Sequence, residues 1–169
     1  MTESQIIQRI KDQFGLEPLP GEGGFYRETY RSNLKIPEDS LPHTYGEARS
    51  YSTAIYYLLT PDSYSAMHQL PGDEVYHFYL GDPVELLLLY PDRSGKKVIL
   101  GNEIFEGMRL QQAVEGGVYQ GAKLVAGGTY ALLGTTMSPG FEFQDFTPGN
   151  RRELLEKFPD YKKEIIALT

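Results

Sequence analysis

The sequence predicts an all-β protein, a sandwich or barrel with helices only near its two ends. Short runs rich in Tyr, Phe, Val and Ile recur along most of the chain, separated by Gly and Pro, as in a fold of many short strands. The 13 Tyr and 8 Phe support this interpretation, because aromatic residues are enriched in strands. No repeat or change of composition marks a second domain. We therefore expect one domain over residues 1–169.

The first expected element is a helix that begins near Thr2 and ends before Gly15. Thr2 and Gln5 have the spacing of a capping box, and four apolar residues recur at helical spacing: Ile6, Ile7, Ile10 and Phe14. Residues 25–31 then alternate two sets of side chains, which predicts a strand with Arg27 on one face and Tyr26 and Glu28 on the other. Residues 35–47, which include His43, contain Pro and Gly and are expected to form a loop.

Strands are expected over most of the remaining chain. The strongest candidates lie within 50–60, 75–80, 84–91 and 96–101, and the turn DRSGK joins the last two as a hairpin. Further strands are expected near 117–119, 129–136 and 141–143. Residues 151–168 predict two short helices that are broken at Pro159.

Composition excludes several classes of function. The formal net charge is −7, and no cluster of Lys and Arg is present, so we expect no nucleic-acid partner. The longest apolar run, Val84 to Tyr90, contains Glu85 and is too short to cross a bilayer. The first residues lack the basic start and apolar run of a signal peptide. We therefore expect a cytoplasmic protein without a membrane partner.

The stretch MHQLPGDEVYHFYLGD contains two of the three histidines. Residues two apart in a strand share a face, so Glu74 and Tyr76 should point one way and His77 the other. His68 precedes the PGD turn and could face Glu74 across a hairpin. Such a His–Glu pair has three interpretations: two metal ligands, a hydrogen-bonded acid–base pair, or a histidine satisfied by a neighbouring acid in a polar barrel mouth.

The order His68, Glu74, Gly81 resembles the first motif of the cupin superfamily, in which a His pair, a Glu and a Gly occur at this spacing. Leu70 stands where the second His is usual. The second motif of that superfamily would fall near VYQGAKLVAGG, with Tyr119 at its Pro position and Leu124 near its His position. Two protein ligands are fewer than the three that an open metal site usually has. We therefore expect no metal or other cofactor, and a metal-dependent enzyme is the less favoured alternative.

Four blocks extend the resemblance over almost the whole chain: EGGFYRETYRS, RSYSTAIYYLL, DEVYHFYLGDP and SPGFEFQDF. Together they resemble a cupin family of unknown function, which is similar to the metal-free epimerases that act on dTDP-4-keto-6-deoxyglucose derivatives. The resemblance implies a cupin-type double-stranded β-helix, that is, a jelly-roll barrel, with a pocket in its mouth. It also implies a homodimer. Aromatic strand edges support that expectation.

Two functional hypotheses follow for a small polar ligand in the barrel mouth, with a nucleotide sugar as one candidate. In the first, the protein is a metal-free isomerase or epimerase: His68 and Glu74 remove a proton beside a carbonyl, and a tyrosine such as Tyr76 returns one. Arg27 would hold an anionic group, and Tyr56 would donate a hydrogen bond to the substrate. In the second, the protein binds its ligand without turnover. The structural alternatives are a surface ion pair for Arg27 and half-buried aromatic packing for the tyrosines.

Overall fold

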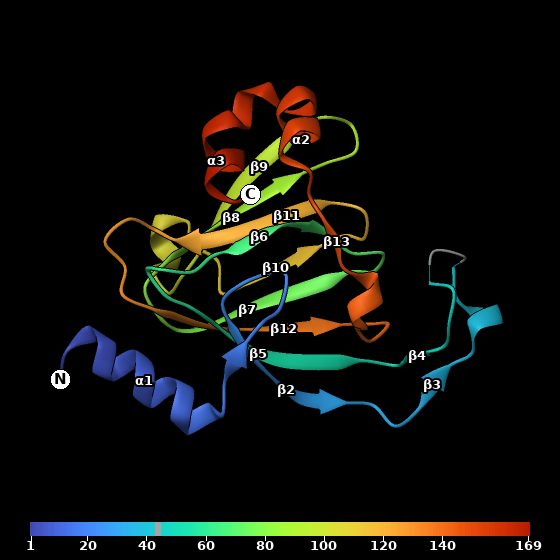
Figure 1. Ribbon diagram of the computed structural model, residues 1–169, viewed down its shortest axis with the longest axis horizontal. Coiled ribbons are helices and arrows are strands. Elements are labelled where there is room, and N and C mark those ends of the chain that lie inside the picture. Colours follow the sequence, from blue (N-terminus) through green and yellow to red (C-terminus); the bar gives the residue numbers. More distant parts are fainter. Residues whose placement is uncertain (43–44) are drawn as a thin grey trace.

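Two antiparallel sheets face each other, and the helices lie outside them, in the computed structural model, which describes residues 1–42 and 45–169 (Figure 1). The helices are α1 (Glu3–Phe14), α2 (Arg151–Lys157) and α3 (Lys162–Ala167). The expected all-β jelly-roll architecture with short terminal helices is therefore confirmed. None of the helices in the described ranges has the length and apolar character needed to cross a membrane.

One sheet has six strands in the order β1-β2-β5-β12-β7-β10. Their bounds are β1 (Glu17–Pro18), β2 (Phe25–Arg31), β5 (Thr53–Leu59), β7 (Glu74–Gly81), β10 (Gln111–Val114) and β12 (Ala131–Met137). The other sheet has five strands in the order β13-β6-β11-β8-β9. Their bounds are β6 (Ser65–Gln69), β8 (Val84–Leu89), β9 (Gly95–Leu100), β11 (Tyr119–Leu124) and β13 (Thr147–Pro148). A separate ribbon joins β3 (Lys35–Ile36) to β4 (Arg49–Ser50).

The main core lies between the two sheets, where inward side chains of alternating strand positions meet. Its largest contributions come from these buried residues: Tyr57, Leu59, Tyr76, Phe78, Leu86, Leu88, Leu100 and Leu133. Two smaller cores lie outside the barrel. One packs α2 and α3 against the five-stranded sheet around Met67 and Leu87, and the other packs α1 against the six-stranded sheet around Leu58 and Leu132. Each sheet thus has one outer region covered by a terminal helix (Figure 1).

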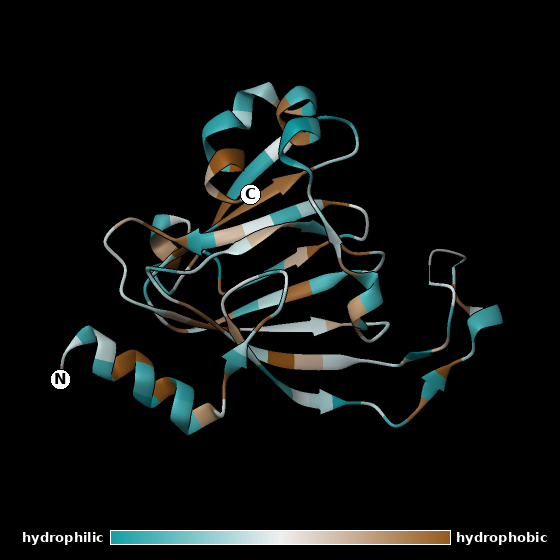
Figure 2. Cartoon of the chain, viewed as in Figure 1, coloured by the Kyte–Doolittle hydropathy of each residue, from teal (hydrophilic) through white to brown (hydrophobic). Residues whose placement is uncertain are grey.

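Helix α1 forms as its sequence predicts. The hydroxyl of Thr2 accepts a hydrogen bond from the backbone N–H of Gln5, whose side chain in turn accepts from the Thr2 backbone, so the capping box is complete. Gly15 ends the helix in the left-handed conformation. Apolar and polar residues alternate along α1 (Figure 2), and its apolar side includes Phe14, whose ring lies 5.0 Å from that of Tyr56.

Residues 141–143 do not form the expected strand. The backbone N–H of Phe141 donates to the Thr53 hydroxyl, and residues Phe143–Asp145 form a 3-10 turn in which the side chains of Glu142 and Asp145 bind each other's backbone N–H groups. These bonds turn the chain back over the barrel. The other expected strands are present, with the β8–β9 hairpin in the predicted place. The chain also breaks between α2 and α3 at Pro159, while His43 lies outside the described residues.

Candidate functional site

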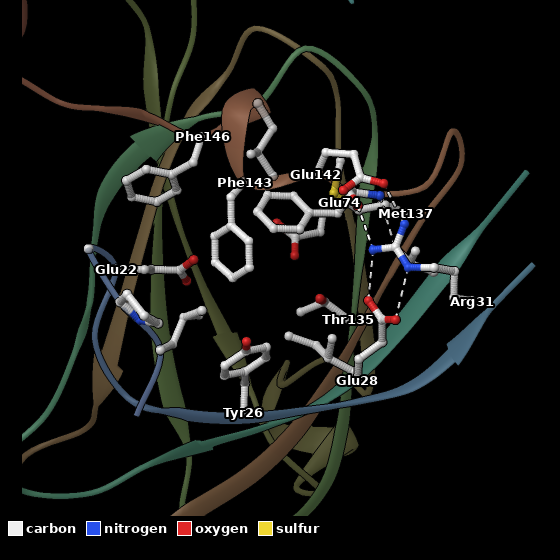
Figure 3. A pocket seen from close by; sticks show the side chains of 17 residues that line it. Glu22, Tyr26, Glu28, Arg31, Glu74, Thr135, Met137, Glu142, Phe143 and Phe146 are labelled. Carbon is white, nitrogen blue, oxygen red and sulfur yellow. Dashed lines mark hydrogen bonds and ion pairs between the residues drawn. The ribbon is translucent and has the colours of Figure 1, made fainter. Parts of the chain in front are cut away.

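A cavity of about 500 Å³ lies inside the barrel at one end (Figure 3). Its walls come from β2, β5, β7 and β12, and its remaining border comes from the loop 19–22, from Leu70 directly after β6, and from the turn 141–146. Most of the lining is apolar: Leu19, Pro20, Ile55, Leu70, Met137, Phe141, Phe143 and Phe146, together with the ring of Tyr26. The volume is in the range of natural small-molecule sites.

Glu74, at the first position of β7, supplies a buried carboxyl group to this cavity and is only 7% exposed. Burial, which penalises the charged form, raises its pKa from 4.5 to about 7, and repulsion from Glu22 acts in the same direction. The imidazole of His68 and the hydroxyl of Thr135 oppose these effects but do not cancel them. Glu74 therefore exchanges its proton near neutral pH.

Gln120, on β11, holds Glu74 from the opposite sheet. Its Nε2 donates to Oε2 of Glu74 at 2.8 Å, while its own Oε1 is buried without a hydrogen-bond partner among the described residues. Gln120 also pairs with His68 across β11 and β6. Leu124, expected near the second-motif histidine position, lies at the end of β11 and pairs with Val84, whereas Gln120 is the β11 residue that reaches Glu74.

His68 is 1% exposed and lies on β6, in the sheet opposite to the strand of Glu74. The two residues therefore face each other across the barrel interior, not within one hairpin. Nδ1 of His68 lies 2.7 Å from the carbonyl oxygen of Ala66, and because a carbonyl only accepts, Nδ1 carries the hydrogen and Nε2 is the nitrogen left for other chemistry. The ring stacks on Phe146, a cavity residue, with centroids 4.9 Å apart.

Glu22 is the second acid in the interior of the cavity, and it was not among the site residues expected from the sequence. Figure 3 shows its carboxylate pointing into the cavity. Ser65 donates to its Oε1 at 2.6 Å. The backbone after Glu22 requires glycine. Gly23 and Gly24 both have positive φ, and a Cβ on Gly23 would lie 2.4 Å from the carbonyl oxygen of Tyr64. In the sequence, Glu22 stands between Gly21 and Gly23. An acidic residue within a run of glycines is the feature that could have identified it as a candidate site residue.

Arg31 lies at the edge of the cavity between two further acids. It forms a bidentate pair with Glu28, one bond of which is Nη2–Oε2 at 2.9 Å, and its Nη1 lies 2.6 Å from Oε1 of Glu142 (Figure 3). Hydrogen bonding to Glu28 raises the pKa of Arg31. The guanidinium group is thus shared by two carboxylates.

His68 itself is not among the residues that line the cavity, and the other expected site residues also lie outside the lining. Tyr76 points inward, as expected, but is buried in the core beside Glu74, and burial raises its pKa well above the usual value. Arg27 and Tyr56 pair on the outer face of the six-stranded sheet, where Arg27 is exposed and Tyr56 contacts α1. Their expected inward orientation is not observed, because Tyr26 and Glu28 occupy the inward positions of β2.

Arg31 reaches the cavity through an irregularity in β2. A register shift between Glu28 and Tyr30 interrupts the alternation, and such a bulge re-aims the following side chains. His77 lies on the outer face, as expected, with Nε2 at 3.0 Å from the Thr136 hydroxyl and Nδ1 at 3.0 Å from Nε2 of Gln111.

The donor atoms near His68 and Glu74 do not fit a transition-metal site. No group of three or more His, Cys, Asp or Glu side chains in residues 1–42 and 45–169 is arranged to hold a metal ion. Gln120 directs its amide N–H, a donor that cannot ligate a cation, at Glu74. Carboxyl, imidazole and amide groups in this arrangement are suited instead to binding and to proton transfer.

Comparison with known proteins agrees with the fold. The family model described as "Cupin superfamily (DUF985)" matches residues 8–148. The uncharacterized protein YML079W of Saccharomyces cerevisiae is 32% identical over 135 residues, which cover 75% of this chain and 67% of that protein.

Solved structures give the same result. A hypothetical protein from Leishmania major has a TM-score of 0.84 and 31% identity, with 96% of this chain and 97% of that chain covered. Protein SO0799 from Shewanella oneidensis has the same TM-score and 28% identity, with 96% of each chain covered. Oxalate decarboxylase from Bacillus subtilis, at 13% identity and a TM-score of 0.54 over 92% of this chain and 38% of that one, shares the fold alone. This chain belongs to the DUF985 family of the cupin superfamily.

Proposed function

We propose that the protein binds a small organic molecule in the barrel cavity and that Glu74 and His68 act on it as acid and base without a metal. The observation that carries the proposal is the buried carboxyl group of Glu74 on the cavity wall, with a pKa of about 7. A group that gains and loses its proton near the working pH is the most effective general acid–base catalyst. Perturbed carboxyl groups in clefts are also characteristic of functional sites.

His68 is the natural partner of Glu74 in this chemistry. Its Nδ1 is committed to the carbonyl of Ala66, which fixes the ring and the tautomer and directs reactivity to Nε2. The apolar walls strengthen electrostatic interactions by lowering the local dielectric constant. The proposed reaction class is isomerisation or epimerisation: one of the two groups removes a proton from carbon beside a carbonyl, and the proton returns to the other face or to a neighbouring atom.

The similarity to dTDP-sugar epimerases makes nucleotide sugars one substrate candidate. Arg31 is the cation of the cavity lining, and a phosphate would have to replace Glu28 or Glu142 as its partner. A small carbonyl compound without an anionic group requires no such exchange. We therefore give small carbonyl compounds the first place in a ligand screen and keep nucleotide sugars as a separate arm.

The test combines binding with proton exchange. Ligands from both arms are screened by thermal shift, because a ligand that binds only the folded state stabilises it by an amount that grows with the logarithm of its concentration once the site is saturated. Compounds that stabilise are then incubated in D₂O, and NMR follows incorporation of deuterium at carbon. We expect catalysed exchange in the natural protein and its loss in Glu74→Gln and His68→Asn, both of which still bind.

Three outcomes would each contradict part of this proposal. Binding without exchange in every case would make the protein a non-catalytic binding protein, which is the second functional hypothesis. Exchange that survives both substitutions would remove Glu74 and His68 from the mechanism. Stabilisation only by nucleotide sugars, and not by small carbonyl compounds, would contradict the substrate preference given above.

A further inference from the structure

We propose that the cavity selects an organic cation, a molecule with an apolar body and an ammonium group that lies between Glu22 and Glu74. This inference rests on the proposed function, because it assumes that the cavity is a ligand site. It goes further by naming the chemical class of the ligand. The argument comes from the charges of the lining, the balance of donors and acceptors at its floor, and the aromatic walls.

The lining carries more negative charge than positive. It contains four glutamates, Glu22, Glu28, Glu74 and Glu142, and a single cation, Arg31. Arg31 is already shared by two of these acids, at 2.9 Å and 2.6 Å. The ion pairs formed within the described part of the chain include none from Lys or Arg to Glu22 or Glu74. The interior of the cavity therefore holds two acids without a counter-cation.

The groups around Glu74 offset its charge only in part. Burial and Glu22 raise its pKa to about 7, although the imidazole of His68 is among the groups that lower it. The phenols of Tyr57 and Tyr76 beside it are buried, and their own pKa values are raised. Taking a carboxylate out of water is costly unless a positive charge compensates it. Glu22 and Glu74 instead repel each other, which is one of the reasons for the raised pKa of Glu74. A ligand cation between them would relieve both costs.

The cavity floor also has more acceptors than donors. The carboxyl groups of Glu22 and Glu74 both accept, and Oε1 of Gln120, directly behind Glu74, is buried with no donor among the described residues. Gln120 is 1% exposed, so bulk water does not satisfy this atom. An ammonium group is a pure donor with three N–H bonds. It matches a floor of this composition, whereas a carboxylate or phosphate would add further acceptors.

Aromatic rings suit the same ligand. Tyr26 and Phe143 meet edge to face with centroids 6.4 Å apart, and Phe141 and Phe143 do so at 5.4 Å. Figure 3 shows Tyr26, Phe143 and Phe146 around the centre of the cavity, with Glu22 directed toward the same space. Ring faces attract cations as well as apolar groups. The walls therefore accept the body of the ligand while the floor accepts its charge.

The experiment compares three probes that share a phenyl-ethyl body: 2-phenylethylamine, 2-phenylethanol and 3-phenylpropanoate. Calorimetric titration of the full chain at pH 7.5 gives their affinities, and NMR shifts of Tyr26 and Phe143 locate the bound probe. We expect the amine to bind at least about 10-fold more tightly than the alcohol, a difference of about 1.4 kcal/mol. The propanoate should bind most weakly.

Variants separate the charge of the cavity from the charge of the whole protein. Glu22→Gln and Glu74→Gln should each weaken amine binding about 10-fold and leave alcohol binding unchanged. Glu103→Gln removes the same charge from an exposed position and should change neither affinity. Thermal melting of each variant verifies that it is folded before its affinities are compared.

Equal affinity for amine and alcohol, tighter binding of the propanoate, or no binding of the amine would each overturn the cation inference. The first of these results, with the probes located at Tyr26 and Phe143, would still leave the cavity as a ligand site. Conversely, amine selectivity together with failure of the deuterium-exchange test would support the cation inference and remove the acid–base role. The two proposals therefore fail in distinguishable ways.

Discussion

Two buried polar groups of this protein differ in how completely their charges are compensated. The first is the pair of Arg49 and Asp145. The second, called the floor, consists of Glu22 and Glu74, which line the cavity, and of His68 and Gln120, which lie outside its lining. Both are built from side chains that rarely leave water without a partner. Only the first has partners for all of its hydrogen-bonding capacity.

Arg49 is completely buried and uses its whole guanidinium group. Nε and Nη2 donate to the two carboxylate oxygens of Asp145 at 3.0 and 2.6 Å. The other bonds go to three backbone carbonyls, of Tyr45, Glu47 and Ala48. The pair connects β4 to the turn Phe143–Asp145, which borders the cavity. Its function is structural, because nothing in it remains free to bind or react.

The cavity floor shows the opposite arrangement. Glu74 is ionisable near neutral pH, Gln120 has an acceptor without a partner, and Nε2 of His68 is not used by the bond that orients its ring. Complete compensation stabilises a fold, whereas incomplete compensation leaves free energy available for a ligand or a proton. This difference is the reason why we propose a functional role for the floor.

Arg49→Met tests the structural group and should have the largest effect. It leaves Asp145 buried as an uncompensated charge and removes donors from three carbonyls, which costs about 3–5 kcal/mol of unfolding free energy. Urea denaturation at pH 7 measures the loss. The matched control is Lys97→Met, which breaks a half-exposed pair with Glu164 at 3.1 Å and should cost less than about 1 kcal/mol. Similar losses for the two variants would contradict the assignment.

Glu74→Gln tests the floor through the pH dependence of stability. The folded pKa of about 7 lies above the ordinary value of 4.5, so the folded state binds the proton more tightly than the unfolded state does. The contribution of Glu74 to the unfolding free energy therefore falls as pH rises from about 4.5 to about 7 and is constant above that. The total is about 3 kcal/mol, from about 1.4 kcal/mol for each pH unit.

Glutamine does not titrate, so Glu74→Gln should be more stable than the natural protein at pH 8 and equally stable near pH 4.5. Urea denaturation across this range measures the difference, with Glu103→Gln as the exposed control. A stability difference that does not change with pH would mean that Glu74 keeps an ordinary pKa in the folded state.

Much of the fold was predictable because its signals are local. The capping box of Thr2 and Gln5, the alternation in 25–31 and the turn DRSGK each act within a few residues, and each forms its element as expected. The turn at Phe143–Asp145 was not predictable, because bonds to distant residues such as Thr53 and Arg49 stabilise it. Pairing over such distances leaves no periodic pattern in the sequence.

The candidate site was predictable only in part, for the same reason. His68 and Glu74 were found by residue type, since both stand within one short stretch. Glu22 and Gln120 join them only through contacts between strands and loops that are far apart in the chain. Alternation correctly separated Arg27 from Glu28, but it could not say which of the two faces points inward.

Gln120→Met also tests the difference between the Arg49–Asp145 pair and the floor, and it should have the smallest effect on the unfolding free energy. The substitution removes the 2.8 Å bond to Glu74, but it also removes the Oε1 atom that has no partner. The two effects oppose each other, so the unfolding free energy should change by less than about 1 kcal/mol. In Arg49→Met no gain opposes the loss, because every hydrogen bond of Arg49 is made to an acceptor that the substitution would leave without this donor.

The clearer consequence of Gln120→Met is for the proton on Glu74. The Gln120 side chain is one of the groups that lower the pKa of Glu74, so its removal should raise that pKa further, because a hydrogen bond to the carboxylate favours the charged form. Titration followed by ¹³C NMR of the glutamate carboxyl carbons measures this. An unchanged or lowered pKa would show that the Gln120 amide does not stabilise the carboxylate. Glu74 would then have no effective partner on the opposite sheet, and its charge would be compensated even less than the hydrogen bond to Gln120 implies, in contrast to Asp145, which keeps both of its bonds to Arg49.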